Sequence, residues 1–355
     1  MRTKILCTLG PASLDPEIIR QLDERGVNLF RLNLSHTPVD TVASLIELIR
    51  KHTSIPICLD TDGVQVRCGV VEDGLTVLEG HEIRLTPETV VGTADRLTLR
   101  PAAVFDALRP GVELGLDISG VVVRVVDASS GQAIAVVVEG GPICSNRAVT
   151  IDQAPHLPPL TDSDLEAVRI GRDLGVRHFA LSFACNRKDV SRLRRLGGPG
   201  SFIISKIESR SGVRNVNGII GASDAVLVDR GDLSREIPLE YVPMYQKEII
   251  RRANSASTPA FVATNLLESM VANRRPTIAE ANDIINTLLD GAHGLVLASE
   301  TTIGLNPVAS VEMVARLIDA FEWSRGRRLV LKSSRRKPSE EPRREDSRPP
   351  AHLAS

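Results

Sequence analysis

The chain has 355 residues, of which 42% are hydrophobic and 25% are charged, a composition typical of a globular protein. Its 43 Lys and Arg residues nearly balance its 44 Asp and Glu residues, so no overall field favours nucleic acid or an anionic membrane. Aromatic residues make up only 3%, which argues against the base-stacking platforms of proteins that bind single-stranded nucleic acid.

Other features of the composition indicate a cytoplasmic protein. No apolar run approaches the roughly 20 residues that span a bilayer, and the first residues lead directly into a strand pattern, which leaves no room for a signal peptide. The five cysteines are odd in number and lack metal-ligand spacing, as in proteins of a reducing compartment. We expect a cytoplasmic protein that binds neither membranes nor nucleic acid.

Short apolar runs alternate along the chain with longer segments of helical periodicity, which is the pattern of repeated βα units. Strands are predicted at 4–8, 28–34, 56–60, 178–183, 202–206, 225–229, 260–263 and 294–297. Helices are predicted at 16–25, 39–51, 164–174, 188–196, 239–253, 277–289 and 307–320. Eight strands with helices between them favour an α/β fold, a (β/α)8 TIM barrel, over the alternative of a doubly wound sheet.

Two segments differ from this pattern. Residues 69–153 contain short alternating strands broken by Gly, Asp and Pro, which indicates a small all-β domain inserted into a barrel loop. Residues 322–355 are polar and basic, and we expect this tail to be disordered. The predicted domains are therefore a barrel (1–68 and 154–321), an inserted β-rich lid (69–153) and the tail.

Polar residues gather where the predicted barrel strands end, which is where barrels place their working side chains. Glu208 and Asp232, predicted on adjacent strands, suit a hard divalent cation such as Mg2+. Lys206, two residues from Glu208 and on the same side of its strand, suits a phosphoryl group or a developing enolate. Arg31 is within reach of a phosphate. Together these residues predict a site for a phosphorylated small molecule that bears a carboxylate.

Several longer motifs occur in order along the chain, and together they resemble the pyruvate kinase family. They are residues 2–13 (RTKILCTLGPAS), 31–36 (RLNLSH), 205–208 (SKIE), 230–233 (RGDL), 263–270 (ATNLLESM) and 299–301 (SET). The resemblance covers about residues 1–320. It implies transfer of a phosphoryl group from phosphoenolpyruvate to ADP, giving pyruvate and ATP, with Mg2+ or Mn2+ and with K+ as a further cation.

The resemblance also implies a role for individual residues. The catalytic residues would be Lys206, Thr264 and Arg31. The substrate would be bound by Lys206 and Thr264 and by the backbone N–H groups of Gly231 and Asp232. The implied Mg2+ ligands are Glu208 and Asp232, and the implied K+ ligands are Asn33, Ser35, Asp60 and Thr61. The residues implied to approach the nucleotide are Arg31, His36, Arg67 and Arg147.

The sequence departs from the family pattern at four positions. Gln65 stands where a charged residue helps to decide potassium dependence, which leaves that dependence open. Cys185 replaces an arginine and Ser234 a glycine, and Arg147 keeps the charge of a lysine but not its geometry. We interpret Glu300 as a structural residue that bonds across the barrel mouth.

Two alternatives to pyruvate kinase activity stay open. One is a related barrel enzyme that acts on a different phosphoenolpyruvate-like or pyruvate-like substrate, by lyase chemistry or with another acceptor. The other is a non-catalytic relative. Because the chain becomes polar after Ala320, we expect no C-terminal regulatory domain and no activation by sugar phosphates, and a homo-oligomer would form through the barrel.

Overall fold

The computed structural model describes residues 2–116, 120–129, 131–151 and 157–326. Within these ranges, eight parallel strands close into a barrel in the order β1-β17-β16-β15-β14-β13-β3-β2. The strands are β1 (Lys4–Leu9), β2 (Leu29–Asn33), β3 (Ile57–Asp60), β13 (His178–Leu181), β14 (Phe202–Ile207), β15 (Ala225–Asp229), β16 (Ala260–Ala263) and β17 (Gly294–Leu297). The predicted TIM barrel is confirmed, and the doubly wound sheet is excluded.

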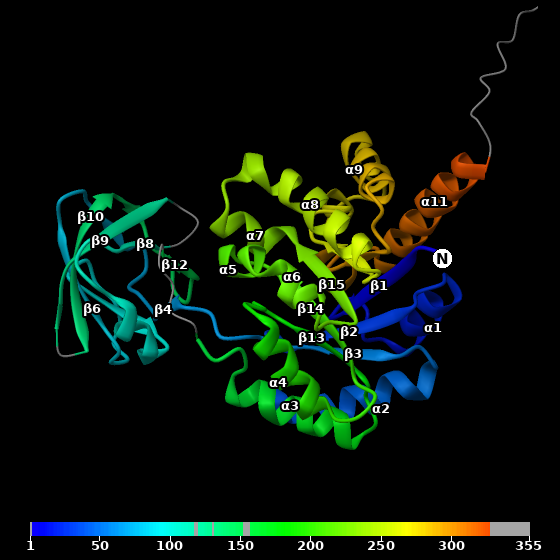
Figure 1. The fold of residues 1–355 in the computed structure, drawn as a ribbon, viewed down its shortest axis with the longest axis horizontal. Coiled ribbons are helices and arrows are strands. Elements are labelled where there is room, and N and C mark those ends of the chain that lie inside the picture. Colours follow the sequence, from blue (N-terminus) through cyan, green and yellow to red (C-terminus); the bar gives the residue numbers. More distant parts are fainter. Residues whose placement is uncertain (1, 117–119, 130, 152–156, 327–355) are drawn as a thin grey trace, which may run out of the picture.

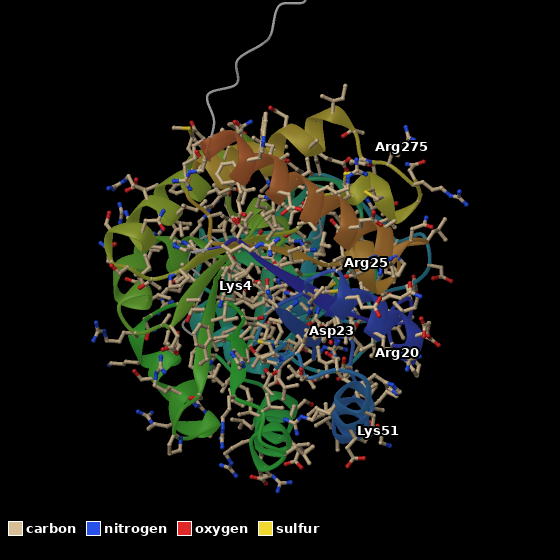
Figure 2. The ribbon with its side chains drawn as sticks, turned by 90° about the vertical axis from the view of Figure 1, so that its right-hand side faces the viewer. Lys4, Arg20, Asp23, Arg25, Lys51 and Arg275 are labelled. Carbon is tan, nitrogen blue, oxygen red and sulfur yellow. The ribbon has the colours of Figure 1, made fainter. Side chains whose placement is uncertain are left out.

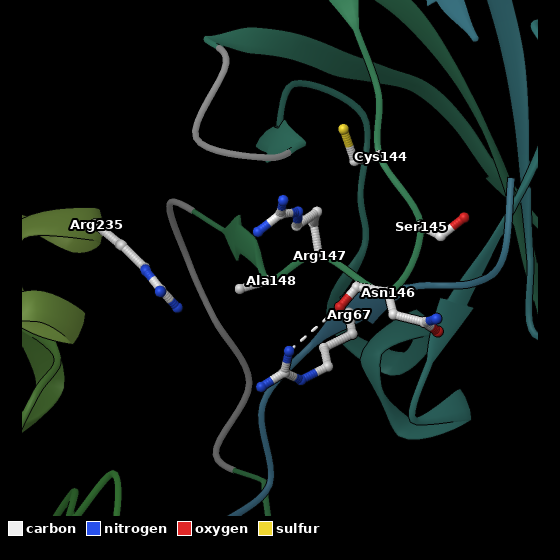
Figure 3. Close-up of a pocket in the computed structure, with 7 residues that line it drawn as sticks. All are labelled: Arg67, Cys144, Ser145, Asn146, Arg147, Ala148 and Arg235. Atoms are coloured by element: carbon white, nitrogen blue, oxygen red, sulfur yellow. Dashed lines mark hydrogen bonds between the residues drawn. The ribbon is translucent and has the colours of Figure 1, made fainter. Parts of the chain in front are cut away.

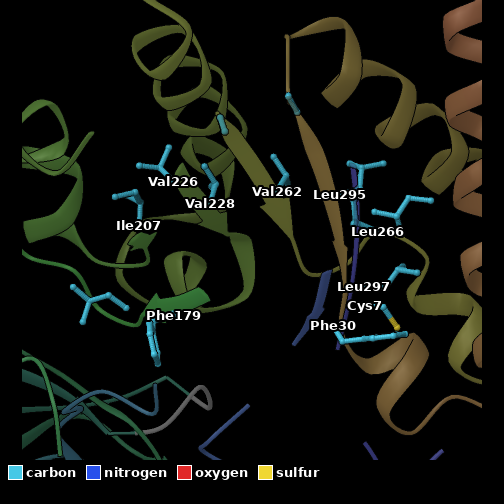
Figure 4. Packing of buried hydrophobic residues seen from close by; sticks show 14 of the residues in the cluster. Cys7, Phe30, Phe179, Ile207, Val226, Val228, Val262, Leu266, Leu295 and Leu297 are labelled. Carbon is cyan, nitrogen blue, oxygen red and sulfur yellow. The ribbon is translucent and has the colours of Figure 1, made fainter. Parts of the chain in front are cut away.

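The barrel strands are apolar on both faces because helices cover the outside and side chains fill the inside. Outward residues such as Phe30, Phe179 and Leu295 pack against the helices and are fully buried (Figure 4). Inward residues such as Leu227 and Phe261 form a separate apolar cluster in the barrel interior. The inward positions become polar toward the C-terminal strand ends, so the apolar interior forms the floor of a polar mouth.

The helices around the barrel are α1 (Pro16–Glu24), α2 (Val42–His52), α3 (Asp162–Asp173), α4 (Arg187–Gly197), α5 (Arg210–Arg214), α6 (Val216–Ile220), α7 (Arg230–Glu236), α8 (Val242–Ser255), α9 (Ile278–Leu289), α10 (Ser299–Thr302) and α11 (Pro307–Gly326). Helix α1 shows why they form. Asp15 caps its first turn by accepting from two backbone amides, and Pro16 at the first position favours helical dihedrals. Its residues Ile19 and Leu22 are buried, whereas Arg20 is exposed on the face that Figure 2 shows.

The structure shifts some predicted helix boundaries. Residues predicted to start two helices form short 3-10 turns instead, η1 (Val39–Thr41) and η3 (Leu239–Tyr241), before α2 and α8 begin. Helix α11 continues to Gly326, so residues 322–326 of the expected disordered tail are helical. Its apolar residues Ile318 and Phe321 are still buried against the barrel at this point. Residues 327–355 of the tail lie outside the described residues.

The inserted segment forms a sheet of its own beside the barrel (Figure 1). Counting described residues only, its seven strands run in the order β12-β8-β9-β10-β6-β7-β4. They are β4 (Arg67–Cys68), β6 (Glu82–Thr86), β7 (Arg96–Arg100), β8 (Glu113–Leu116), β9 (Val121–Ser129), β10 (Gln132–Glu139) and β12 (Val149–Ile151), while β5 (Thr76–Val77) pairs with β11 (Gly141–Pro142). The sheet has a separate apolar core that includes Ile83, Leu97 and Val123. We keep the name lid for residues 69–153, although β4 of its sheet lies just before this range, and the predicted domain boundaries stay predictions.

One buried carboxylate fixes the chain where it leaves the barrel for the lid. Asp164, at the start of α3, accepts from the backbone N–H groups of Asp62 at 2.7 Å and Gly63 at 3.1 Å. The same side chain closes a capping box with Thr161, which satisfies two otherwise free amides at the helix start. The segment after β3 is therefore tied to the helix that follows the lid.

As for the membrane prediction, none of the helices in the described part of the chain has the length and apolar character needed to cross a bilayer.

Candidate active site

A buried lysine lies at the centre of the polar barrel mouth. Lys206 projects inward from β14 and its side chain is 8% exposed. Its Nζ lies 2.8 Å from Glu208 Oε1, 3.4 Å from Asp60 Oδ2 and 3.9 Å from Asp229 Oδ2, and it donates to the Ser182 hydroxyl at 3.0 Å. Four barrel strands or strand ends thus direct polar groups at one ammonium, and the predicted proximity of Lys206 and Glu208 is confirmed.

A second buried cation flanks this lysine. Arg31 projects inward from β2, with its Nη1 3.0 Å from Asp60 Oδ2 and its Nε donating to the Thr8 hydroxyl at 2.8 Å. Asp60 therefore lies between two cations and is completely buried. Two cations therefore share one buried carboxylate. This pair fixes the position of Arg31 at the level of Lys206, inside the barrel.

Three carboxylates gather beside Lys206. Oxygen atoms of Glu208, Asp229 and Asp232 all lie within 4.8 Å of one another. The prediction that Asp232 belongs to a strand end is wrong, because β15 ends at Asp229 and Asp232 lies in the first turn of α7. Asp229 caps this helix by accepting from the Gly231 N–H, and the turn brings Asp232 back toward Glu208. The cluster is built from β15, α7 and the residue after β14.

Asp229 is a member of this cluster that the sequence analysis did not single out. Its Oδ1 accepts from the Thr264 hydroxyl at 2.5 Å and from the Gly231 N–H at 3.2 Å. The inward register of β15 is Ala225, Leu227 and then Asp229, since side chains two residues apart share a face. The two-residue alternation of strand side chains therefore predicts an inward Asp229, as it predicts that Lys206 and Glu208 face the same side.

The pKa values in the cluster reflect burial and mutual charge. Burial alone would lower the pKa of Lys206, but the carboxylates of Asp60, Glu208 and Asp229 raise it above its ordinary value. Burial raises the pKa of Glu208 to about 8, although Lys206 acts in the opposite direction. Burial and the charge of Asp229 also raise the pKa of Asp232. The mouth therefore holds an ammonium whose charge is favoured by its neighbours, beside carboxyl groups that favour an additional positive charge.

Thr264 follows β16 in a strained backbone conformation. Its φ is +70°, which is a genuine outlier for a β-branched residue and costs about 1–3 kcal/mol. Arg230 holds this conformation by donating through Nε to the Thr264 carbonyl at 3.0 Å while its Nη1 bonds Asp283 at 2.6 Å. Phe183, which also has positive φ, donates its N–H to Glu208 Oε2 at 2.7 Å. The positive φ values of Phe183 and Thr264 thus occur where the Phe183 N–H contacts Glu208 and the Thr264 hydroxyl contacts Asp229.

The four residues implied as K+ ligands lie around the ends of β2 and β3. Asn33 is opposite Asp60 in the strand register, and its Oδ1 accepts from the Ser35 N–H at 3.1 Å. Thr61 is buried, and the Ser35 hydroxyl donates to Asp62 at 2.6 Å. Among the described residues, Asp60 Oδ1 is buried with no hydrogen-bond partner. A buried carboxylate oxygen of this kind fits a further cation.

A cleft of about 590 Å3 opens from the carboxylates toward the lid. Glu208 and Asp232 line it on the barrel side, and Gln65 and Cys185, two of the departures from the family pattern, line it as well. Burial raises the pKa of the Cys185 thiol, so this residue is not an activated thiolate. The third departure, Ser234, donates its hydroxyl to the Gly231 carbonyl at 2.8 Å and stays within α7.

The residues implied for the nucleotide lie in different places. Arg67 of β4 and Arg147 of the lid line a hollow of about 220 Å3, and Arg235 of α7 reaches it from the barrel (Figure 3). Arg235 also pairs with Asp232, at 3.1 Å, and lines the cleft as well. Arg31 is instead inside the barrel, and His36 is exposed in the loop after β2. The structure therefore brings only two of the four predicted residues together.

Glu300 accepts from one buried and one partly buried backbone amide. Its carboxylate oxygens accept from Leu267 N–H and Ala298 N–H, both at 2.9 Å, and the residue is 2% exposed. It ties the loop after β16 to the end of β17, which agrees with its interpretation as a structural residue.

Comparison with known proteins places these features in one family. Residues 1–311 match the family model described as the barrel domain of pyruvate kinase. The chain is 37% identical over 341 residues to a pyruvate kinase of Agrobacterium vitis. This alignment covers 94% of this chain and 72% of the relative. It is 36% identical over 332 residues to a pyruvate kinase of Mycobacterium tuberculosis (90% and 70% covered) and 36% identical over 327 residues to one of Corynebacterium glutamicum (89% and 69% covered).

Proposed function

Because the chain belongs to the pyruvate kinase family, we propose that its barrel mouth transfers the phosphoryl group of phosphoenolpyruvate to ADP, giving pyruvate and ATP. The observation that carries the proposal is the buried Lys206 ammonium, 2.8 Å from Glu208 and beside two further carboxylates. A fixed positive charge in a water-poor site stabilises negative charge that develops during reaction far better than it would in water.

In the proposed reaction, different residues of the mouth contact the phosphoryl group and the enolate, the two groups joined by the bond that breaks. An oxygen of the ADP β-phosphate attacks phosphorus, the bond from phosphorus to the enol oxygen breaks, and the enolate takes a proton at carbon to become pyruvate. Lys206 stabilises the phosphoryl group and the enolate oxygen, and Arg31 binds the phosphoryl oxygens. Thr264 lies at the substrate carboxylate, near the face where the proton is added.

The donor set fits a divalent cation, Mg2+ or Mn2+. Hard cations prefer carboxylate oxygens, and Glu208 and Asp232 would hold the ion, with Asp229 within reach. Glu208 Oε1 is buried and lies 2.8 Å from Lys206 Nζ. Such an ion supplies charge stabilisation at the phosphoryl and enolate oxygens. We extend the proposal to K+ near Asn33, Ser35, Asp60 and Thr61, because Asp60 Oδ1 is buried and has no hydrogen-bond partner among the described residues.

The lid hollow supports a site for the phosphates of ADP. Arg67, Arg147 and Arg235 line it, and arginine forks bind phosphate oxygens in pairs. Its volume of about 220 Å3 is below the roughly 300–1,000 Å3 of sites that enclose a drug-sized ligand. It therefore suits the diphosphate, with the base and ribose outside. The role of His36 at the nucleotide, the cytoplasmic location and a homo-oligomer through the barrel stay predictions.

A coupled assay tests the proposed reaction against its alternatives. The protein is mixed with phosphoenolpyruvate, ADP and Mg2+, with and without K+, and pyruvate is followed through lactate dehydrogenase. Pyruvate formation that requires ADP supports the proposal. Cation-dependent binding of oxalate (an enolate mimic) without turnover favours a related enzyme with another substrate. Absence of any cation-dependent binding favours a non-catalytic relative.

A further inference from the structure

The carboxylate of Asp229 fills a small cradle of hydrogen-bond donors at the start of α7. Its Oδ1 accepts from the Thr264 hydroxyl at 2.5 Å and from the Gly231 N–H at 3.2 Å. Its Oδ2 lies 3.9 Å from Lys206 Nζ, and the side chain is 10% exposed. A carboxylate with two donors on one oxygen and an ammonium near the other is held as a bound anion would be.

These donors are the same groups that the proposed reaction needs for the carboxylate of its substrate. A hydroxyl and a backbone amide each have a single hydrogen to donate. The hydrogens of Thr264 and Gly231 cannot serve Asp229 and a substrate carboxylate at full strength at the same time. A second carboxylate brought close to Asp229 would also be repelled by its charge.

We propose that Asp229 is an internal occupant of the subsite for the substrate carboxylate, where it competes with phosphoenolpyruvate and pyruvate and sets their affinity. The inference rests on the proposed function, because that function requires a substrate with a carboxylate at Thr264 and Gly231. Asp229 is thus a specificity-determining residue. It selects ligands that bind the cation and Lys206 strongly enough to displace its side chain.

The surroundings of Asp229 support this competition. Both carboxylate oxygens of Asp229 already have partners, because Oδ1 accepts from Thr264 and Gly231 and Oδ2 lies near the Lys206 ammonium. The cradle is also narrow, because a Cβ added at Gly231 would lie 3.1 Å from Thr264 Cγ2. Gly231 and Thr264 therefore approach each other closely around the Asp229 carboxylate.

Oxalate binding tests the inference without requiring turnover. Calorimetric titrations with oxalate at saturating Mn2+ compare the wild type with Asp229→Ala, Asp229→Ser and Asp229→Asn, and the Mn2+ affinity of each variant is measured separately by electron paramagnetic resonance. The serine variant retains a helix cap, and thermal unfolding checks that each variant folds. The matched control is Asp224→Ala, just before the first residue of β15, where Asp224 pairs with Arg194 at 2.8 Å.

We expect oxalate to bind at least tenfold more tightly to the alanine and serine variants. The asparagine variant, whose amide still fills the cradle, should gain less than threefold, and the control should match the wild type. Equal or weaker oxalate binding by Asp229→Ala and Asp229→Ser would overturn the inference. An equal gain in Asp229→Asn and Asp229→Ala would also overturn it, because charge rather than occupancy would then explain the effect.

The two proposals fail in different ways. If wild-type protein forms no pyruvate from phosphoenolpyruvate and ADP, the proposed function fails whatever the oxalate affinities are. If pyruvate forms but Asp229→Ala and Asp229→Ser bind oxalate no more tightly than the wild type, only the competition by Asp229 is wrong.

Discussion

Replacing Lys206 with methionine removes a positive charge that contacts three neighbouring carboxylates, those of Asp60, Glu208 and Asp229. The methionine side chain has a similar length and fills most of the same space, so the substitution mainly deletes the ammonium. We expect turnover to fall by about 10^3-fold or more, the upper end of the range for loss of one preorganised group that stabilises developing charge. The folded state should also become less stable.

The size of the stability change follows from the distances. At an effective dielectric constant of about 20, charges 2.8, 3.4 and 3.9 Å apart attract by about 6, 5 and 4 kcal/mol. Desolvation of the buried groups offsets most of this attraction. Removal of one partner from a buried pair lowers the free energy of unfolding by about 3–5 kcal/mol, and we expect a loss in that range for Lys206→Met.

A double variant separates the structural role of Lys206 from its catalytic role. Adding Asp60→Asn to Lys206→Met removes one buried negative charge along with the positive one and should recover part of the lost stability. Turnover, measured by the coupled assay, should stay about 10^3-fold below that of Asp60→Asn alone. If the double variant turns over as fast as Asp60→Asn, or if Lys206→Met keeps a tenth of wild-type turnover, Lys206 is a structural residue and the reasoning is wrong.

Three further predictions concern the nucleotide, the cation and the barrel mouth. Arg147→Met should raise the KM for ADP about tenfold, because it removes a cation from the lid hollow, and change the KM for phosphoenolpyruvate less than twofold; equal changes would contradict a nucleotide site there. Burial raises the pKa of Glu208 to about 8 and also raises that of Asp232. Because metal ligands must lose their protons, Mn2+ affinity measured by electron paramagnetic resonance should rise from pH 6 to pH 8, and a flat profile would count against these ligands. Glu300→Gln should lower the free energy of unfolding by about 1–3 kcal/mol, because Glu300 accepts from two backbone amides and an amide has one accepting oxygen. An unchanged denaturant midpoint would argue against this role.

The barrel was predictable because its strands are buried on both faces. Such strands appear in the sequence as continuous apolar runs, and β15, β16 and β17 begin and end at the predicted residues. Helix ends were less predictable. Helix α11 runs beyond Ala320 because Phe321 still packs against the barrel, and the charged residues that follow masked this last apolar contact.

The site was predictable only where strand periodicity determines it. Lys206 and Glu208 lie two residues apart at the end of β14, so their shared direction follows from the pleat. Asp232 was misplaced because the turn from β15 into α7 depends on the Asp229 cap, a local hydrogen bond that periodicity does not encode. The contact of Asp60 with both Arg31 and Lys206 joins three strands, and its pairing depends on barrel closure.

The most direct measurement of the central claim is a crystal structure with Mn2+ and oxalate, in which anomalous scattering locates the ion. We expect the ion to be bound by Glu208 and Asp232, with oxalate in contact with both the ion and Lys206 Nζ. An ion held elsewhere in the barrel mouth, or oxalate bound away from Lys206, would contradict the account.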